Sequence, residues 1–435
     1  MHLRAIQISN IRSLKNLHWA LPNKQDGAGW HVILGDNGSG KSSFMQAVAL
    51  ALVGPDEARA ARQDFNQWRR RGSKRAEIAL DLLAHPEDQW KSRGKQSEEL
   101  NINLKLEPSA DDSRIVHAHG PEGRKSGPYR TVWTDKEGWF SAGFGPFRRF
   151  RGGESDSQRL FLSNPNLAPH LSIFSEGIAL GESLEWLSRL HIRGLEFNSA
   201  LEKELLQALQ SFVNLSELLP HGIQLADISA EDVRFRDVSG EPITVMALSD
   251  GFRSVLSLTF ELMRLLDWAY GRTNFLNSLK ANLETGRTPP PINLPGVVLI
   301  DEVDAHLHPT WQHRIGQWFT RCFPRMQFIV TTHSPIICQA AWPGSVYKLP
   351  TPGTNEEGRM IQGEELKRLV YGSVLDAFRT SAFDAAVTRS AQAKELIDEL
   401  AALNVKEIAE GLTADEQRRQ TELRGMLPGL DPRAN

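Results

Sequence analysis

The stretch GDNGSGKS, from Gly35 to Ser42, combines residue types that bind phosphate. It fits the spacing G-x-x-x-x-G-K-[ST] and stands between the apolar run 32–34 and an apolar stretch that begins at Phe44. Glycines let successive backbone N–H groups converge on phosphate oxygens, and a helix N-terminus adds a favourable dipole. Lys41 then reaches the β- and γ-phosphates, and the Ser42 hydroxyl ligates Mg²⁺. The pattern predicts a site for ATP and Mg²⁺ whose nucleotide contacts are Gly35, Asn37, Gly38, Gly40, Lys41, Ser42 and Ser43.

Two carboxylates follow a second apolar run, Val297–Ile300. Such a run is typical of a buried strand in a parallel sheet. At the end of that strand, Asp301 is placed to hold the Mg²⁺ shell, and Glu302 is placed to polarise a water for attack on the γ-phosphate. An acidic helix cap with a solvated neighbour is the structural alternative. The phosphate-binding stretch upstream favours the catalytic interpretation.

A histidine, His333, follows a third apolar run, 328–330, and two threonines. A lone histidine after a strand is more often a structural hydrogen-bonding residue than a catalytic one. Here a helix-like stretch, 311–323, separates this run from Asp301, which predicts the next strand of the same parallel sheet. In that position the imidazole can reach the edge of the γ-phosphate.

The segment Ser249-Asp250-Gly251 precedes an apolar run with helical periodicity, 255–266. In the structural interpretation, Ser249 is the N-cap of a helix. This interpretation does not exclude a functional one, because a capped helix N-terminus is itself an anion site.

Taken in order, these four motifs resemble those of ABC-type ATPases of the SMC and RecF kind. More narrowly, they resemble the prokaryotic AAA ATPases related to overcoming-lysogenisation-defect proteins and to the Septu anti-phage ATPase. The resemblance covers most of residues 1–60 and 240–345. It implies an α/β P-loop NTPase fold of the ABC/SMC-head type, with a mixed β lobe and a parallel-sheet lobe, a helical insertion and C-terminal helices.

The resemblance also implies a composite site in a head-to-tail dimer. Ser249 and Gly251 of one subunit would cap the γ-phosphate held by the phosphate loop of the other. Glu302 would be the general base and His333 the switch histidine. Asp304 would be a further contact to the nucleotide of the other subunit, because it lies in the segment that crosses to that subunit.

Asn10-Ile11-Arg12-Ser13 resembles the N-terminal Asn-Phe-Arg-Ser of the same group, whose arginine lies near the phosphates. Arg12 is therefore either a nucleotide contact or a solvated turn residue. The glutamine of the Mg²⁺-sensing loop has two candidates, Gln63 and Gln158. In the segment that starts at Ser249, Asp250 and Phe252 stand where the ATPase subunits of transporters mostly carry Gly and Gln. This difference favours a RecF-like ATPase over a transporter subunit.

Periodicity predicts the elements around these motifs. Residues 2–9, 77–82 and 100–107 alternate as half-buried strands do, and residues 171–215 have helical spacing. The polar stretch 271–296 is typical of a surface loop or of a linker between two better-defined elements. Beyond about residue 372 the pattern is helical, with an apolar stripe that is either a dimer or partner surface or packed on its own subunit. A capping box at 413–416 starts the last helix, and Pro428-Gly429 ends it.

These elements predict four regions. They are ATPase lobe I with the phosphate loop (1–150), a helical insertion (151–240), ATPase lobe II (241–350), and a C-terminal helical region for dimer or partner contact (351–435). Lobe II carries the signature segment 248–253, the Walker B pair Asp301-Glu302 and the switch histidine His333.

Composition narrows the class of protein. With 40% apolar and 24% charged residues, the chain of 435 residues is typical of a globular protein without a membrane span, and we expect it in the cytoplasm. Cys322 and Cys338 are expected to be buried free thiols. The net charge of −3 argues against a protein that coats nucleic acid by bulk electrostatics, although a local basic patch remains open.

Two basic stretches are candidates for nucleic-acid contact. The first contains Arg62, Arg69, Arg70, Arg71, Lys74 and Arg75. The second, 144–151, interleaves three phenylalanines with Arg148, Arg149 and Arg151. Arginines can contact phosphates while aromatic rings stack on bases. The alternatives are a solvated face for the first stretch and a loop packed beside the nucleotide for the second.

The leading hypothesis is an ATPase that dimerises around ATP, senses or clamps nucleic acid and regulates a separate effector nuclease in anti-phage defence. A homodimer or higher even oligomer is expected. No acidic cluster resembling a Toprim nuclease domain follows residue 345, so a nuclease activity would come from another polypeptide. The main alternative is a RecF-like DNA-repair ATPase; a transporter subunit fits the signature and the insertion poorly.

Overall fold

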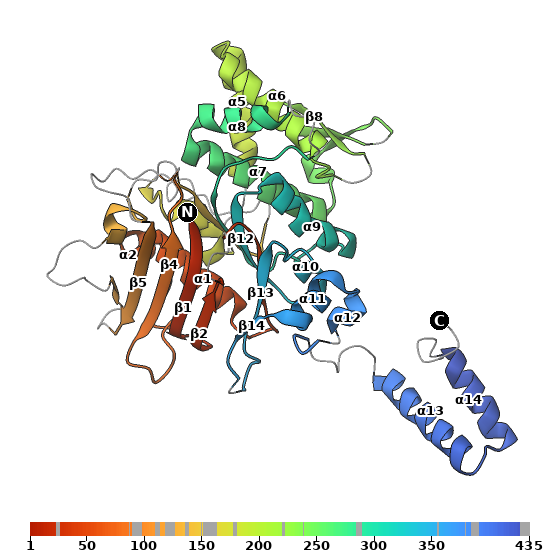
Figure 1. Cartoon of the computed structure of the whole chain (residues 1–435). Helices are drawn as coiled ribbons and strands as arrows, with labels where there is room; N and C mark the ends of the chain where they lie inside the picture. The colour runs from red at the N-terminus through yellow and green to blue at the C-terminus, as the bar shows by residue number, and fades with distance from the viewer. Residues whose placement is uncertain are drawn as a thin grey trace. The chain divides into compact units, whose positions relative to one another are not determined.

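The structure is a computed structural model that describes residues 1–22, 27–86, 88, 98–108, 114–117, 127–134, 139–148, 150, 163–176, 181–219, 222–237, 239–283, 289–354, 356–378, 380–383 and 391–426. The chain divides into two compact units, Met1–Tyr371 and Gly372–Asn435. Figure 1 labels many of the helices and strands of both units. The four predicted regions remain a prediction.

A six-stranded sheet with the order β14-β13-β3-β12-β11-β7 forms the centre of the first unit. All neighbours in it are parallel except β13 and β14. Every residue of β3, β11 and β12 is buried, as is typical of strands covered on both faces. The strands are β3 (Gly29–Leu34), β7 (Ser141–Phe144), β11 (Gly296–Ile300), β12 (Met326–Thr332), β13 (Gly344–Lys348) and β14 (Arg359–Ile361). The two predicted parallel neighbours, β11 and β12, are thus confirmed.

A second, antiparallel sheet has the order β2-β1-β4-β5-β6. Its strands are β1 (His2–Ile11), β2 (Leu14–Ala20), β4 (Ala76–Leu83), β5 (Glu99–Glu107) and β6 (Arg114–His117), which confirms the three strands predicted from alternation. Helix α1 (Lys41–Val53) contacts strands of both sheets, and all but two of its residues are buried. A helix that is apolar on all sides is buried on all sides, so α1 holds the phosphate loop against the shared core.

A helical layer is visible at the top of Figure 1, in yellow-green and green. It contains α5 (Glu182–Glu196), α6 (Ala200–Leu215), α7 (Asp250–Tyr270) and α8 (Arg272–Leu283), together with a small sheet of β8 (Gln224–Ile228), β9 (Val233–Arg236) and β10 (Pro242–Thr244). The predicted helices within 171–215 are confirmed by α5 and α6. The shorter helices of this unit are α2 (Pro55–Ala58), α4 (Leu171–Phe174), α10 (Pro335–Cys338) and α11 (Gly363–Tyr371).

Helix α8 contradicts the surface loop or linker predicted for 271–296 over residues 272–283, whereas residues 289–295 form no helix or strand. Phe275, Leu276 and Leu279 lie on one side of this helix and are at most 3% exposed. The helix packs on α6 and α7. The local sequence is polar enough to resemble a loop, and the helix forms because tertiary packing covers its narrow apolar face.

The second unit contains α12 (Val374–Phe378), α13 (Ala391–Ala409) and α14 (Ala414–Met426). Leu400 and Leu423 form the centre of its small apolar cluster. The predicted capping box is confirmed, because the Thr413 backbone N–H donates to Glu416 Oε2 at 2.9 Å and the Glu416 N–H donates to Thr413 Oγ1 at 3.4 Å. The predicted end of this helix at Pro428-Gly429 lies outside the described residues.

Among the described residues, no helix has the length and apolar character that crossing a membrane requires. Cys322 and Cys338 are buried and unbridged, as predicted.

Candidate nucleotide-binding and hydrolysis site

The phosphate loop joins β3 to α1, as the motif requires. Gly38 and Gly40 have φ values of 82° and 101°, which side chains rarely adopt. A Cβ at Gly40 would also lie 2.7 Å from Ser13 Oγ. Lys41 is 5% exposed, and its Nζ donates to the carbonyls of Gly35 at 2.8 Å and Asp36 at 3.0 Å. The loop therefore holds its lysine across the position that phosphates occupy in such motifs.

The start of α1 fits an anion. Its N-cap, Gly40, has no side chain to bond the free amides, and the first turn carries no acidic residue. Asp36, Asn37 and Gly38 are exposed, whereas Ser39 is buried with a hydroxyl that lacks a hydrogen-bond partner. Ser42 is half-buried and Ser43 is buried beside it. These residues suit a phosphate group and, through the Ser42 hydroxyl, a Mg²⁺ ion.

The two carboxylates predicted after β11 lie on a tightly bonded loop. Asp301 is 3% exposed, and its Oδ1 accepts a hydrogen bond from Thr331 Oγ1 at 2.5 Å. The same Thr331 oxygen accepts the backbone N–H of Glu302 at 2.7 Å. Glu302 is half-buried and has a φ of 45°, the left-handed region, where a residue with a side chain is strained. The loop thus fixes the backbone of the predicted base in an uncommon conformation.

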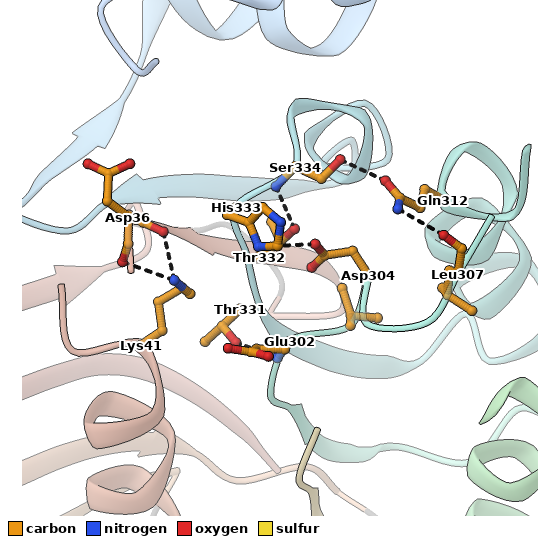
Figure 2. A network of polar contacts seen from close by, with 12 residues as sticks. Asp36, Lys41, Glu302, Asp304, Leu307, Gln312, Thr331, Thr332, His333 and Ser334 are labelled. Atoms are coloured by element: carbon orange, nitrogen blue, oxygen red, sulfur yellow. Dashed lines mark hydrogen bonds and ion pairs between the residues drawn. The ribbon is translucent and has the colours of Figure 1, made fainter. Parts of the chain in front are cut away.

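The histidine after β12 meets a carboxylate of the same chain. His333 Nδ1 lies 3.3 Å from Asp304 Oδ2, and the exposed fractions of the two side chains are 64% and 3% (Figure 2). The other Asp304 oxygen is buried without a hydrogen-bond partner. Asp304 was predicted to contact the nucleotide of another subunit, and in this chain its carboxylate faces His333.

Strand order brings these groups together. β12 lies between β3 and β11, and all three strands run in the same direction, so their carboxyl ends meet at one edge of the sheet. The Gly35 N–H donates to the carbonyl of Thr332 at 3.4 Å, which ties the phosphate loop to the histidine loop. Figure 2 shows Lys41 on one side of this edge and Glu302, His333 and Asp304 on the other.

The signature segment opens α7 in a different way. Ser249 is the N-cap, but its hydroxyl makes no capping hydrogen bond, and both Ser249 and Asp250 are exposed. A Cβ at Gly251 would lie 3.0 Å from the carbonyl of His306. A cavity of about 350 Å³ lies beside this turn; its lining residues are Arg148, Phe150, Met246, Asp250, Arg253, Ser254 and His306. The N-terminus of α7 therefore faces outward with its side-chain cap unused.

Arg12 is not a solvated turn residue. Its Nη1 donates to Gln46 Oε1 at 2.6 Å, and its guanidinium lies 4.8 Å from the centroid of the Trp68 ring. Burial lowers the pKa of Arg12 below its ordinary value. Gln46 belongs to α1, so Arg12 is fixed beside the helix that starts at the phosphate loop, and a nucleotide contact remains a prediction.

Of the two glutamines considered for the Mg²⁺-sensing loop, Gln63 is half-buried. Its Nε2 donates to the carbonyls of Ala61 at 3.2 Å and Phe174 at 2.9 Å. Gln158 lies outside the described residues. Strand β7, the parallel neighbour of β11, ends at the same edge as the phosphate loop and continues into Gly145 and Pro146.

In the second basic stretch, the burial of the described residues favours the packed-loop alternative over a contact with nucleic acid. Arg148 is 5% exposed, and Phe144 and Phe150 are 1% and 6% exposed, so these rings are not open to bases. Burial lowers the pKa of Arg148 to about 10, although nearby carboxylates act in the opposite direction. Because this pKa is well above 7, the guanidinium is protonated at neutral pH. Arg149 and Arg151 lie outside the described residues. The alternative, a loop packed beside the nucleotide site, agrees with these contacts.

The first basic stretch keeps its exposed character. Arg62, Arg70, Arg71, Lys74 and Arg75 are exposed, and Arg69 is half-buried. Arg70 donates to the carbonyl of Ser13 at 2.9 Å, and Ser13 lies against Gly40 of the phosphate loop. The stretch therefore lies close to the phosphate loop, and its contact with nucleic acid stays a prediction.

Sequence reasoning missed the Thr331 hydroxyl and left the role of the buried Arg148 open. A signal for Thr331 exists, because a threonine two residues before the histidine is at the end of a parallel strand. Arg148 offers no such signal, since its burial depends on residues about 150 positions away in the chain.

The model of the AAA domain family described as putative AbiEii toxin, Type IV TA system, matches residues 31–339. The chain belongs to this AAA family. The match spans the phosphate loop, the signature segment, the Asp301-Glu302 pair and His333, so the chain carries an ATPase domain of this family.

Among curated relatives, the AAA chain is 24% identical over 355 residues to the Septu protein PtuA of Bacillus mycoides (strain KBAB4), which covers 79% of this chain and 40% of that protein. It is 38% identical over 96 residues to the Retron Ec83 probable ATPase of Escherichia coli, with 22% of this chain and 15% of that protein covered. The chain thus spans less than half the length of these relatives.

Among solved structures, the AAA chain is similar to an SMC head bound to the C-terminal winged-helix domain of ScpA. The TM-score is 0.49 at 16% identity, covering 83% of this chain and 98% of that one. It is also similar to the recombination mediator protein RecF, with a TM-score of 0.41 at 12% identity and coverage of 83% and 98%.

Proposed function

We propose that this chain binds ATP at the edge formed by β3, β12 and β11 and hydrolyses it after two copies have closed around the nucleotide. The observation that carries the proposal is that the predicted catalytic residues lie together at one sheet edge, whereas the signature segment of α7 is exposed. Lys41 at the start of α1 lies at one sheet edge with Glu302 and His333 on their loops, whereas the signature turn of α7 faces outward with its capping hydroxyl unused. A second copy that presents its α7 to this edge would complete the site.

In this proposal, the phosphates replace the loop carbonyls as partners of Lys41 Nζ, and the free amides of α1 bind the same oxygens. Ser42 and Asp301 are the residues that fit a Mg²⁺ ion, which when bound would neutralise charge on the phosphate oxygens. Thr331 orients the Asp301 carboxylate for that role through its hydroxyl.

Glu302 acts as the general base. Its carboxylate accepts a proton from water while the water oxygen forms a bond to the γ-phosphorus. The bond from that phosphorus to the bridging oxygen breaks, which gives ADP and phosphate. His333 contacts the γ-phosphate edge, and Asp304 orients its imidazole from 3.3 Å. Ser249 and Gly251 of the second copy stabilise the charge of the same phosphate.

Relation to the Septu protein supports a role in anti-phage defence, in which the ATP-driven closure regulates a separately encoded effector nuclease in the cytoplasm. The exposed basic stretch from Arg62 to Arg75 supports contact with nucleic acid near the phosphate loop. The chain covers 40% of that relative. The effector nuclease, the contact with nucleic acid and the dimer are therefore all proposals for this chain.

The Glu302→Gln variant tests the ATPase proposal. The amide keeps the size of the side chain but cannot accept the proton, so hydrolysis should fall by about 10²–10⁴-fold while ATP binding is kept. Light scattering with ATP should then detect an accumulating dimer. The exposed Glu231 in the β8–β9 turn provides the control, and Glu231→Gln should behave as wild type. Normal turnover by Glu302→Gln would show that the base is assigned wrongly.

Salt dependence of binding tests the nucleic-acid part. If the six cations of the first basic stretch meet phosphates, the logarithm of affinity should fall against the logarithm of salt concentration with a slope of about −5. Replacing Arg71 and Lys74 by Gln should make the slope shallower by about 2. A slope near zero for the wild type would remove nucleic acid from the proposal.

Neighbouring genes separate the proposal from the repair alternative. A nuclease or reverse-transcriptase gene beside this one would support defence, and a replication operon would support a RecF-like repair ATPase.

A further inference from the structure

The side chain of Arg148 uses all five of its N–H groups inside the protein. Nε donates to Ser254 Oγ at 3.1 Å. Nη1 donates to the carbonyls of Gly145 at 3.1 Å and Asp301 at 2.9 Å. Nη2 donates to the carbonyls of Glu302 at 3.0 Å and Val303 at 3.5 Å. A guanidinium has five donors in a rigid planar fork, so this environment matches arginine and no other side chain.

Three of these acceptors are consecutive carbonyls of the loop that carries the predicted Mg²⁺ ligand and the predicted base. Glu302, in the middle, has the left-handed φ of 45°. Strained backbone persists only where the surroundings hold it in place. The two terminal nitrogens of Arg148 donate to the carbonyls of Asp301, Glu302 and Val303, and Thr331 Oγ1 accepts the Glu302 N–H. Arg148 is therefore one of the groups that fix the direction of the Glu302 side chain.

The remaining donor connects this loop to the signature helix. Ser254 lies in the first turns of α7, five residues after Ser249, and it accepts the Arg148 Nε. Ser257, one turn further, donates to the Arg148 carbonyl at 3.4 Å. A displacement of the α7 N-terminus would thus move the guanidinium, and the guanidinium would move the carbonyls around Glu302.

The position of Arg148 is itself fixed from the side of the phosphate loop. Gly145 approaches α4 so closely that a Cβ would lie 2.0 Å from the Ser172 carbonyl, and its N–H donates to Ser172 Oγ at 3.2 Å. The next residue, Ile173, accepts a hydrogen bond from Gln46 of α1 at 3.0 Å, and Gln46 accepts the bond from Arg12. The loop that carries Arg148 is therefore linked to α1 through α4, and to α7 through Ser254.

We propose that Arg148 is a positioning residue that couples contact of the α7 N-terminus with a partner's nucleotide to the placement of Glu302 for hydrolysis. This inference rests on the proposed function, since it assumes that Glu302 is the base and that α7 acts on a second copy. Arg148 touches neither phosphate nor water in this role; it acts through the backbone of the loop.

The Arg148→Lys variant tests the proposal because it keeps the charge but supplies three donors from one nitrogen, so it cannot bind Ser254 and the four carbonyls together. At saturating ATP, kcat should fall about 10²-fold, as expected when a catalytic group is misplaced by about 1 Å. The KM and the affinity for a fluorescent ATP analogue should stay within about threefold of wild type. As with Glu302→Gln, the ATP-bound dimer should accumulate.

The matched control is Arg264→Lys. Arg264 lies on α7 itself, has a side chain that is 11% exposed, and binds the carboxylates of Glu261 and Glu182. Its replacement changes a paired, half-buried guanidinium without touching the Glu302 loop, so kcat should remain within about threefold of wild type. A fall in kcat that is equal in both variants and follows their thermal stability would overturn the proposal, because it would reflect loss of structure alone.

Ser254→Ala isolates the connection to α7. It removes the acceptor for Nε and leaves the four carbonyl contacts in place, so kcat should fall about tenfold with unchanged ATP affinity. Normal kcat in Ser254→Ala, or kcat within about threefold of wild type in Arg148→Lys, would refute the coupling. Failure of the proposed function is distinguishable, because the wild type would then not hydrolyse ATP or Glu302→Gln would still do so.

Discussion

The phosphate loop and the N-terminus of α7 are both helix starts that suit an anion, and the chain treats them differently. Lys41 is 5% exposed and is held by carbonyls of its own loop, and α1 behind it is buried on nearly every side. Ser249 and Asp250 are exposed, and no side chain caps the helix that they begin. The comparison teaches that one anion site is preorganised by the core of the chain, whereas the other is open in a way that suits a second molecule.

The largest expected effect comes from the preorganised end. Lys41→Ala removes the cation that the phosphates need, so ATP affinity should fall by about 10²–10³-fold and hydrolysis should be lost with it. The measurement is equilibrium binding of a fluorescent ATP analogue. Lys280→Ala, which removes an exposed lysine paired with Glu204, is the control and should bind normally. Normal ATP affinity in Lys41→Ala would show that the loop is not the phosphate site.

At the exposed N-terminus of α7, we expect a substitution to weaken ATP binding little and to slow ATP hydrolysis strongly. Ser249→Phe places a bulky ring where the partner's phosphate would approach, so ATP should still bind to the monomer while hydrolysis falls about 10²-fold or more. The exposed Ser239 in the β9–β10 turn gives the control, and Ser239→Phe should hydrolyse ATP normally.

Mixing variants sharpens the comparison further. Equal amounts of Lys41→Ala and Ser249→Phe should recover about a quarter of wild-type hydrolysis, because half of the dimers are mixed and each has one intact site. If both ends served the same site within one chain, the mixture would stay inactive.

The smallest expected effect is on the free energy of unfolding, and it comes from Cys338, a buried residue shortly after the His333 loop. Burial, and secondarily the charge of Asp304, raises the pKa of Cys338 from 9.0 to about 12. The folded state therefore favours the protonated thiol, so this contribution to the free energy of unfolding is complete below pH 9 and is lost as pH rises from about 9 to 12. Urea unfolding should give a lower stability at pH 10 than at pH 8, less so in Cys338→Ala.

The same pKa predicts that Cys338 in the native protein does not react with a thiol reagent at pH 8, because the reactive species is the thiolate. Labelling should appear only with unfolding. Stoichiometric labelling of Cys338 in the native state would mean that the core beneath the His333 loop opens.

Local patterns were sufficient for the elements that carry the motifs. The phosphate loop, the buried strand before Asp301 and the strand before His333 were predicted correctly, because a fully buried parallel strand needs a continuous apolar run wherever it occurs. The capping box at Thr413 and Glu416 was also found, since both partners lie within one turn.

Failures occurred where the deciding partner is distant in the chain. Helix α8 was taken for a loop because the apolar positions Phe275, Leu276 and Leu279 mean little until α6 and α7 cover them. For Arg148, the sequence left nucleic-acid contact and a loop packed beside the nucleotide both open, because an arginine between phenylalanines has the composition of either. The pairing of β7 with β11 favours the packed loop, because it places Arg148 beside the Glu302 loop.

The sequence by itself determined the chemistry of the edge: a phosphate loop, two carboxylates and a histidine, each at the end of a strand that its own residues specify. Only the tertiary structure decided how these groups act on one another. The order β3-β12-β11 set which loops meet, Thr331 and Arg148 set the direction of Asp301 and Glu302, and the uncapped start of α7 was left facing outward. The physical reason is that strand identity depends on local hydrophobic pattern, whereas the partners of a buried polar group depend on which distant segments desolvate it.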